Sequence, residues 1–444
     1  MKVCIVGGGG GASNAGDVIR RLDPQAQIDI FTNRGEIGNQ PCEIPFVLRG
    51  DLPSWDDTFV FREKYYSQRD INVHVDTEVT EIVREEKRLV AGGQSYDYDK
   101  AILDLGAIPI IPRIPGVDGQ NEFVLATGLR PAKVFEQAIP RHSSAAIIGV
   151  GQIAVEVAGV LKAKEYDKIY LLGRSDRLFR AYLDKDMAER IEQRVRERGI
   201  ELILSAKINS IRSRNGKKIV SLADGELEVD FVFFATGARP NVELAKKAGI
   251  TIGESGAIAV NSYLQTSDPD IYAIGDCMEN WDRITGRKRT YQTATSGALT
   301  GRIAATNLVL GNVLPHQGMV MAFVTEVFGY ELGTVGLTET YAREQGLDVV
   351  ANITTTATRR RSFAGKTIHI KLIADRQSQS LIGAQLISEE LVAGKIDRLA
   401  LAIGERIPVQ RLAVIDTCYS PTVGSAYEST VMALDQLIPK LRET

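Results

Sequence analysis

The chain has 444 residues, of which 44% are hydrophobic and 25% charged, and its formal net charge at pH 7 is −3. A chain of this length exceeds one hydrophobic core and indicates two or three domains. The small net charge gives no electrostatic reason to expect nucleic acid or an anionic membrane as a partner, and no apolar run reaches the roughly 18 residues of a membrane span. A predicted strand begins beside Met1 and leaves no room for a signal peptide, so we expect a cytoplasmic protein.

The first predicted elements are a strand, a glycine-rich loop and a helix, in that order. The loop that follows the apolar strand runs from Gly7 through Gly9 and Gly11 to Ala12. In a dinucleotide-binding loop the first glycine makes a tight turn and the second lets the backbone approach a pyrophosphate. The small third residue lets the helix pack on the strand. A second strand over residues 28–31 completes a strand–helix–strand unit.

The same pattern returns in the middle of the chain. An apolar strand leads to a second loop, with Gly149, Gly151 and Ala154, and a helix is predicted over residues 151–163. One such loop can be an ordinary turn, but two in one chain indicate two dinucleotides and a protein that moves electrons between them. The next predicted elements are a strand over 168–172 and a charged helix over 184–199.

Later segments indicate a return to the first unit and then a different domain. Strands near 230–234 and 270–274 precede Gly237 and Gly275, and we expect a helix-rich stretch from there to about residue 310. The prolines of residues 107–118 indicate a stiff connection between domains. From Pro315 onward, alternating strands and helical segments near 387–404 and 426–441 indicate an α+β domain without a nucleotide loop.

This ordered set resembles the pyridine nucleotide–disulfide oxidoreductases along essentially the whole chain. Within that family it looks most like the single-cysteine branch, which contains coenzyme A-disulfide reductases, persulfide reductases, NADH oxidases and peroxidases. Besides the two glycine loops, the resemblance is carried by Ala235-Thr236-Gly237, Gly275-Asp276, Ile19-Arg20-Arg21-Leu22-Asp23, Pro41-Cys42-Glu43-Ile44-Pro45-Phe46, Tyr182-Leu183-Asp184 and Asp416-Thr417-Cys418-Tyr419-Ser420-Pro421.

The resemblance implies an α/β fold with two Rossmann-like dinucleotide-binding domains, for FAD and NAD(P), and a C-terminal α+β dimerisation domain. It implies an FAD domain split between 1–110 and 235–315, an NAD(P) domain over 111–234 and a dimerisation domain over 316–444. The implied cofactors are FAD and NAD(P)H. The implied cofactor-binding residues are Gly7, Gly9, Gly11, Ala12, Thr32, Asn33, Gly106, Gly149, Gly151, Ala154, Glu156, Arg174, Arg180, Gly237, Gly275, Asp276 and Thr295.

Two of these assignments come with stated physical roles. Asp276 is expected to accept hydrogen bonds from the ribityl or pyrophosphate part of FAD, although an aspartate there can also cap a helix. The helix from about Thr295 is expected to point its positive N-terminal end at the flavin pyrimidine ring, which favours the anionic reduced flavin.

Cys42 is the cysteine to which the resemblance assigns redox chemistry. In the relatives it begins a helix beside the flavin, and a helix N-terminus lowers the pKa of a thiol and stabilises the reactive thiolate. Pro45 suits the first turn of such a helix. Val47 stands where two-cysteine relatives have their second cysteine, so Cys42 is expected to cycle through a mixed disulfide, persulfide or sulfenate. The alternative for Cys42 is a buried structural cysteine, the reading that we prefer for Cys4 and Cys277.

The C-terminal segment is expected to complete the partner's site in a homodimer. In the relatives the tyrosine that matches Tyr419 reaches the other subunit's active site and acts as an acid or hydrogen-bond donor near the substrate sulfur. Cys418 is either an ordinary strand residue or the partner of Cys42 in an inter-subunit disulfide.

Several positions depart from the family pattern. Gly10 replaces the histidine with which peroxidase relatives handle peroxide, which argues against peroxide as the main substrate. Thr32, or Asn33, stands in place of the acid that holds the FAD ribose, and the Ala-Thr-Gly turn has become Asp104-Leu105-Gly106. The residues just before Cys42 also differ from those of coenzyme A-disulfide reductases.

Arginines suggest two anion sites. Arg174 and Arg180 follow the second strand of the NAD(P) unit, where NADH-preferring relatives have an acid. Glutathione reductases use arginines at this spacing for the 2′-phosphate of NADPH, so the resemblance favours NADPH. The alternative is that both are solvated surface residues. The run over 359–361 is either a solvated hairpin or a receptor for an anionic part of the substrate.

We therefore predict an FAD-dependent NAD(P)H oxidoreductase that reduces a low-molecular-weight disulfide or persulfide through Cys42, a coenzyme A-type thiol being favoured. The first alternative is an NAD(P)H oxidase that reduces dioxygen at the flavin. The second is a redox-responsive binding protein that keeps the nucleotide folds without useful turnover.

Overall fold

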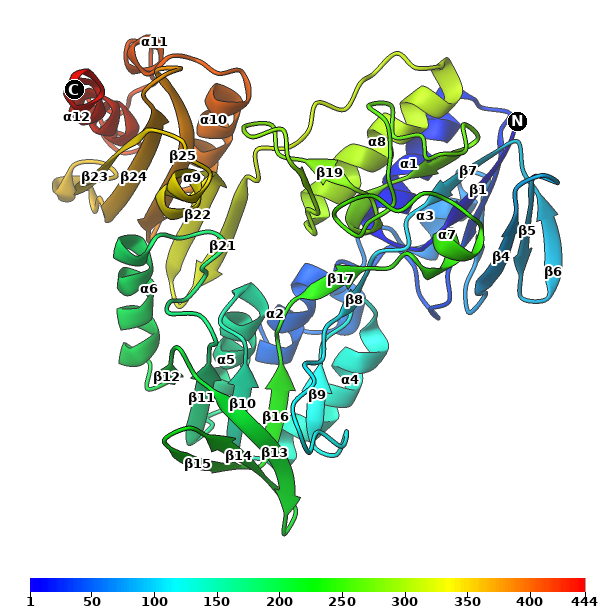
Figure 1. The fold of residues 1–444 in the computed structure, drawn as a ribbon, viewed down its shortest axis with the longest axis horizontal. Helices are drawn as coiled ribbons and strands as arrows, with labels where there is room; N and C mark the ends of the chain where they lie inside the picture. The colour runs from blue at the N-terminus through cyan, green and yellow to red at the C-terminus, as the bar shows by residue number, and fades with distance from the viewer. Residues whose placement is uncertain (444) are drawn as a thin grey trace.

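The computed structural model describes residues 1–443, so the last residue of the predicted dimerisation domain lies outside the described part. Figure 1 shows three lobes, and a long loop leads from α8 (Ala294–Leu310) of the first lobe to β21 (Phe323–Val327) of the third. Each lobe is built on a five-stranded sheet. Two of these sheets are parallel and the third is antiparallel, which confirms the predicted combination of two Rossmann-like units with an α+β domain.

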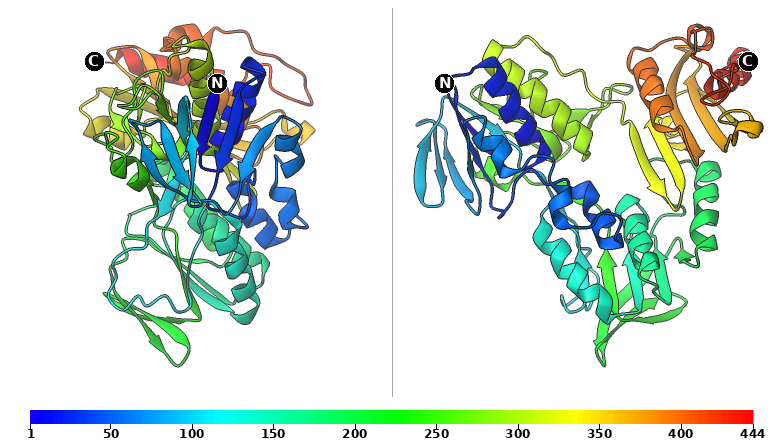
Figure 2. Two further views of the ribbon diagram at one scale, coloured as in Figure 1. Left: turned by 90° about the vertical axis from the view of Figure 1, so that its right-hand side faces the viewer. Right: turned by 180° about the vertical axis from the view of Figure 1, so that it is seen from behind.

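The first lobe contains a parallel sheet in the order β18-β7-β1-β2-β3. Its strands are largely buried apart from the edge strand β3, as expected of a parallel sheet covered on both faces. Helices α1 and α8 lie side by side on one face (Figures 1 and 2), close enough that a Cβ at Gly301 would stand 2.4 Å from the Gly11 oxygen. The elements are β1 (Lys2–Val6), α1 (Gly10–Leu22), β2 (Gln27–Phe31), β3 (Ile71–His74), β7 (Lys100–Leu103), β18 (Ile271–Ala273) and α8 (Ala294–Leu310).

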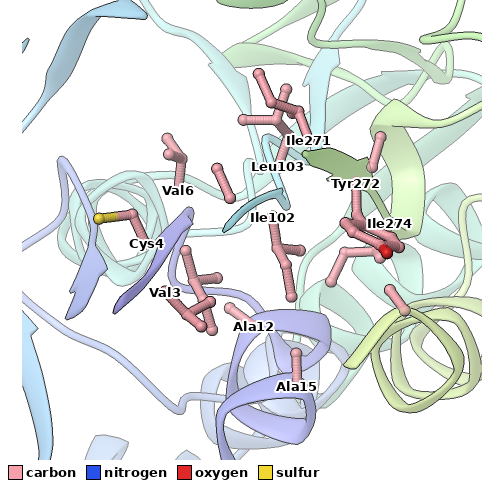
Figure 3. Packing of buried hydrophobic residues seen from close by; sticks show 14 of the residues in the cluster. Val3, Cys4, Val6, Ala12, Ala15, Ile102, Leu103, Ile271, Tyr272 and Ile274 are labelled. Atoms are coloured by element: carbon pink, nitrogen blue, oxygen red, sulfur yellow. The ribbon is translucent and has the colours of Figure 1, made fainter. Parts of the chain in front are cut away.

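The core of this lobe holds α1 against the sheet. Figure 3 shows Ala12 and Ala15 on the helix side, and Val3 and Ile102 on the sheet side. Small helix residues let the helix approach the strands closely, which places the first turn of α1 at the carboxyl edge of the sheet. Cys4 is fully buried in this core, as predicted.

Further short elements lie in the same parts of the chain as the first lobe, and of these the segment over residues 44–59 packs into the core of the second lobe. Residues 276–293 form a short hairpin rather than the predicted helix-rich stretch, because polar side chains such as Asp282 anchor a turn there. These elements are η1 (Pro41–Glu43), α2 (Ile44–Arg49), η2 (Trp55–Thr58), α3 (Glu63–Ser67), β4 (Val79–Val83), β5 (Arg88–Ala91), β6 (Gln94–Asp97), α7 (Glu243–Lys247), η4 (Gly275–Cys277), β19 (Asn280–Trp281) and β20 (Lys288–Arg289).

The second lobe repeats the parallel arrangement in the order β12-β11-β10-β16-β9. An antiparallel three-stranded sheet covers one face, and helices cover the other. Its elements are β9 (Glu122–Val124), α4 (Leu129–Ala138), η3 (Ile139–Arg141), β10 (Ser144–Ile148), α5 (Gln152–Ala163), β11 (Lys168–Leu172), α6 (Lys185–Glu197), β12 (Glu201–Ile203), β13 (Ile208–Arg214), β14 (Lys217–Leu222), β15 (Gly225–Val229) and β16 (Phe231–Phe234).

A two-stranded antiparallel ribbon joins the first two lobes. It pairs β8 (Ala107–Pro109) with β17 (Ala238–Pro240), so the chain leaves and re-enters the first lobe at one place. This is the region where the proline pattern indicated a crossing. The domain boundaries stay predictions.

The third lobe is an antiparallel sheet in the order β21-β22-β25-β24-β23, packed against helices. The predicted helical segment at 387–404 begins later, because β25 runs to Ser388 before the helix starts at Ala393. The elements are β21 (Phe323–Val327), β22 (Tyr330–Gly336), α9 (Glu339–Glu344), β23 (Val349–Ala357), η5 (Arg361–Phe363), β24 (Thr367–Asp375), β25 (Ser380–Ser388), α10 (Ala393–Gly404), α11 (Val409–Ala413) and α12 (Ser429–Arg442).

No helix within residues 1–443 combines the length and apolar character that crossing a membrane requires.

Candidate functional site

One connected cavity of about 1460 Å³ runs from the first glycine loop to the second. Most of the residues predicted from the sequence line it: Gly9, Gly11, Cys42, Gly106, Gly149, Gly151, Glu156, Arg174, Arg180, Gly237, Gly275 and Asp276. The predicted residues outside its lining are Gly7, Ala12, Thr32, Asn33, Ala154, Thr295 and Tyr419.

The first glycine loop ends in an open helix N-terminus. Gly7 has a φ of +122°, and a Cβ there would stand 2.0 Å from the Asp104 carbonyl oxygen, so only glycine fits this turn. Helix α1 begins at Gly10, and its first turn contains no acidic residue. A Cβ at Gly10 would meet no atom within 4 Å, so the helix N-terminus faces open space, the usual setting for a phosphate.

The side chain of Asp104 lies at the N-terminus of α1, against the first glycine loop. Its Oδ2 accepts a hydrogen bond of 2.9 Å from the Ala12 backbone N–H, and it lines the cavity. Burial raises the pKa of Asp104 to about 6, while the Ala12 N–H and the charge of Arg34 oppose the shift. The sequence revealed only an altered turn at this position and did not identify Asp104 as a site residue.

Thr32 and Asn33 do not reach the cavity. Thr32 is buried beneath Gly8, and its hydroxyl accepts a hydrogen bond of 3.2 Å from the Arg34 backbone N–H. Asn33 is exposed. Arg34, which the sequence analysis did not single out, lines the cavity instead, and its guanidinium donates to the Thr127 carbonyl oxygen at 3.1 Å.

Two polar residues from later in the chain, Asp276 and Thr293, line the same cavity. Burial, and then the charge of Asp104, raise the pKa of Asp276 to about 7. Helix α8 begins at Ala294 with Thr293 as its N-cap, whose hydroxyl accepts from the Ser296 N–H at 3.2 Å. Thr293 and Ala294 therefore border the cavity, whereas Thr295 is exposed and lies outside the lining.

Cys42 lies in the cavity wall within η1, immediately before α2. Helix α2 packs against α5 of the second lobe, which brings Glu156 of α5 near the thiol. Burial raises the pKa of Cys42, and the charges of Glu156, Glu43 and Asp276 raise it further. The predicted lowering of this pKa by a helix N-terminus is therefore wrong for these residues alone, because burial first, and then the charges of nearby carboxylates, favour the neutral thiol.

Replacing Glu156 by glutamine is expected to lower the pKa of Cys42, because it removes the largest carboxylate contribution while Gln152 can still hydrogen-bond the side chain. The measurement is the pH dependence of Cys42 alkylation by iodoacetamide, followed by mass spectrometry. Glu136→Gln, on α4 and outside the cavity lining, serves as the matched control. An unchanged alkylation midpoint in Glu156→Gln would show that Glu156 does not act on the thiol.

The second glycine loop has the same turn geometry as the first. Gly149 has a φ of +137°, and a Cβ there would stand 2.1 Å from the Ala235 oxygen. Ala154 is fully buried and lets α5 pack on the sheet, which explains its absence from the lining. At the end of β11, Gly173 lies against Val150, while Arg174 and Arg180 are exposed at the cavity edge.

Tyr419 and Cys418 lie on an exposed segment after α11, away from the cavity of their own chain. Their predicted roles concern a partner subunit and stay predictions. In the basic run at 359–361, Arg359 pairs with Glu390 at 2.9 Å.

Comparison with known proteins identifies the family. Residues 1–298 match the model of the pyridine nucleotide-disulphide oxidoreductases, and residues 324–431 match the dimerisation domain of the same family. The chain belongs to the pyridine nucleotide-disulphide oxidoreductase family. As predicted from its sequence, it is a flavin-dependent NAD(P)H oxidoreductase with FAD and NAD(P)H as cofactors.

Three individual proteins show how this family member compares with others. An NADH oxidase from Methanocaldococcus jannaschii is 32% identical, with 99% of each chain covered. A CoA-dependent NAD(P)H sulfur oxidoreductase from Pyrococcus furiosus is 31% identical, with 97% of this chain and 98% of the relative covered. The structure of an engineered water-forming NADPH oxidase bound to NADPH superimposes with a TM-score of 0.94 at 23% identity, over 99% of each chain.

The residues of this oxidoreductase fit the flavin cofactor of the family. Asn39 Nδ2 and Gln292 Nε2 are buried without a hydrogen-bond partner among the described residues, and both side chains line the cavity. Buried donors of this kind call for an acceptor, which a bound dinucleotide supplies. With the open α1 N-terminus and Arg34, they would hold FAD along the first lobe. Neither amide was predicted, because a lone Asn or Gln in a loop carries no sequence signal.

Proposed function

We propose that this oxidoreductase uses NADPH to reduce a low-molecular-weight disulfide or persulfide of the coenzyme A type through Cys42. The observation that carries the proposal is a single accessible thiol in the wall of the cavity that joins both nucleotide loops. Cys4 and Cys277 are buried, and Cys418 lies on the exposed C-terminal segment, so no second thiol of residues 1–443 lines that cavity.

The chemistry proposed for Cys42 is thiol–disulfide exchange. Its thiolate attacks one sulfur of the substrate, forms a mixed disulfide and releases the other sulfur as a thiolate. Bound FAD supplies the two-electron link from the nicotinamide to this sulfur. A proton must leave the thiol before attack, and the raised pKa of Cys42 makes this step costly at neutral pH. The proposed acceptor is the carboxylate of Glu156, whose charge acts on the thiol. Reduction of the mixed disulfide restores the thiol and frees the second substrate thiol.

The residues that follow β11, beside the second glycine loop, support the proposed preference for NADPH over NADH. Gly173 leaves no acid to bind a ribose 2′-hydroxyl, and Arg174, Ser175 and Arg180 follow it. The engineered NADPH oxidase carries substitutions to alanine, arginine and serine at three consecutive positions, and to arginine five positions further on. The present chain has Arg, Ser and Arg at the same spacing, with a glycine in place of the alanine.

We further propose a homodimer in which the third lobe forms the interface. The segment around Tyr419 exposes apolar side chains that a monomer would leave in water, among them Val414, Val423 and Tyr427. In a dimer this surface would be covered, and Tyr419 would lie against the partner's cavity.

Anaerobic NADPH oxidation against a substrate panel tests the proposed reaction. Coenzyme A disulfide, coenzyme A persulfide, glutathione disulfide and polysulfide are compared with one another and, in a separate arm, with dioxygen. We expect the coenzyme A substrates to give the highest kcat/KM. Fast oxygen consumption with no response to any sulfur substrate would instead assign the activity of an NAD(P)H oxidase, the name that the Methanocaldococcus relative bears.

A further inference from the structure

The Asp104 carboxylate packs closely against the glycines of the first loop. A Cβ at Gly9 or Gly11 would stand 2.8 or 3.0 Å from its Oδ2, and a Cβ at Gly275 would stand 2.8 Å from its Oδ1. Oδ2 also accepts the Ala12 N–H, which belongs to the first turn of α1. The side chain of Asp104, which follows β7, thus caps the N-terminus of α1 where that helix faces the cavity.

In dinucleotide-binding loops the pyrophosphate lies at this end of the helix. Helix N-termini bind anions because their first N–H groups are unpaired and the helix dipole is positive there. Among the described residues, the N–H groups of Gly10 and Gly11 have no acceptor, while that of Ala12 is taken by Asp104. An ionised Asp104 and a pyrophosphate would place like charges at one helix end inside a buried site.

The surroundings of Asp104 do little to neutralise it. Within residues 1–443, Arg34, which follows β2, is the one cation that acts on it, and Arg34 also interacts with Glu36. Asp276 of η4 adds a second carboxyl, and the Cys277 thiol is buried beside it. The first turns of α1 and α8 contribute no charged side chain. Burial already raises the pKa of Asp104 to about 6 before any phosphate is present.

We propose that FAD binding by this protein is coupled to protonation of Asp104, so that the flavin site accepts the pyrophosphate only when the Asp104 carboxyl is neutral. One proton is therefore taken up for each FAD bound at a pH where Asp104 is otherwise ionised. Above that titration the apparent affinity for FAD falls with the protonated fraction, by about tenfold for each pH unit. At pH 8 the loss is about 100-fold relative to a chain that carries no ionisable group at this position.

The test measures FAD release from the holoenzyme. Diluted holoenzyme is equilibrated between pH 6 and pH 9, free FAD is separated by ultrafiltration, and its fluorescence gives the dissociation constant. We expect the wild-type constant to rise with pH, and that of Asp104→Asn to rise much less steeply and lie about 100-fold lower at pH 8, with the Asp276 carboxyl accounting for the pH dependence that remains. Asparagine keeps an oxygen for the Ala12 N–H, so the helix cap is preserved.

Two further variants keep the test decisive. Asp104→Ala removes the side chain and is expected to bind FAD as tightly as Asp104→Asn, which separates the effect of charge from that of the hydrogen bond. Asp29→Asn, a buried acid on β2 outside the cavity lining, is expected to keep the wild-type pH dependence. A flat wild-type profile, or weaker FAD binding in both Asp104 variants across the whole pH range, would overturn the proposal.

Discussion

Replacing Cys42 by serine is expected to lower turnover of coenzyme A disulfide or persulfide at least about 1000-fold, because a serine hydroxyl cannot form the mixed disulfide on which the proposed reaction depends. Reduction of bound flavin by NADPH should persist, since the nucleotide loops and the helix packing around them are unaffected. Stopped-flow absorbance under anaerobic conditions measures flavin reduction, and steady-state assays measure sulfur turnover.

Cys418→Ser is the matched control for this variant. Its thiol is exposed and lies outside the cavity of its own chain, so turnover should stay close to that of the wild type. A loss of activity in Cys418→Ser comparable to that in Cys42→Ser would point instead to an inter-subunit disulfide between them. If Cys42→Ser retains disulfide turnover, the proposed electron route ends elsewhere.

The double replacement Arg174→Ala and Arg180→Ala is expected to raise the KM for NADPH about 100-fold and to leave the KM for NADH nearly unchanged. Hydrogen bonds to charged groups contribute about 1.5 kcal/mol each, and two such contacts to one 2′-phosphate correspond to about a factor of 100. Both side chains are exposed at the cavity edge, so their removal costs little packing. Initial rates with each nucleotide at constant ionic strength provide the measurement.

Arg130→Ala serves as the control for charge alone, since Arg130 is exposed on α4 and does not line the cavity. It should affect neither nucleotide. Equal wild-type turnover with NADH and NADPH, unchanged in the double variant, would contradict the NADPH assignment and leave both arginines as surface residues.

Sequence reasoning was sufficient for the parts of this protein that depend on local pattern. Apolar runs followed by Gly7 or Gly149 predicted both turns, because a left-handed backbone conformation beside a neighbouring strand excludes every residue with a Cβ. The resemblance to the family, rather than local pattern, placed Cys42 and Asp276 at the cofactor cavity, and the structure brings both residues together with the two loops.

Tertiary packing decided what local pattern does not encode. Thr32 and Asn33 occupy the expected chain position but do not reach the cavity, because the turn after β2 brings Arg34 there instead. The pKa of Cys42 rises rather than falls, first because the thiol is desolvated by burial and then because α2 packs against α5, whose Glu156 carries a negative charge. Asp104 contacts a helix that begins far from it in sequence. The pKa of a side chain depends on its burial and on the charges around it. Both are set by long-range packing, which brings together segments that are far apart in the sequence.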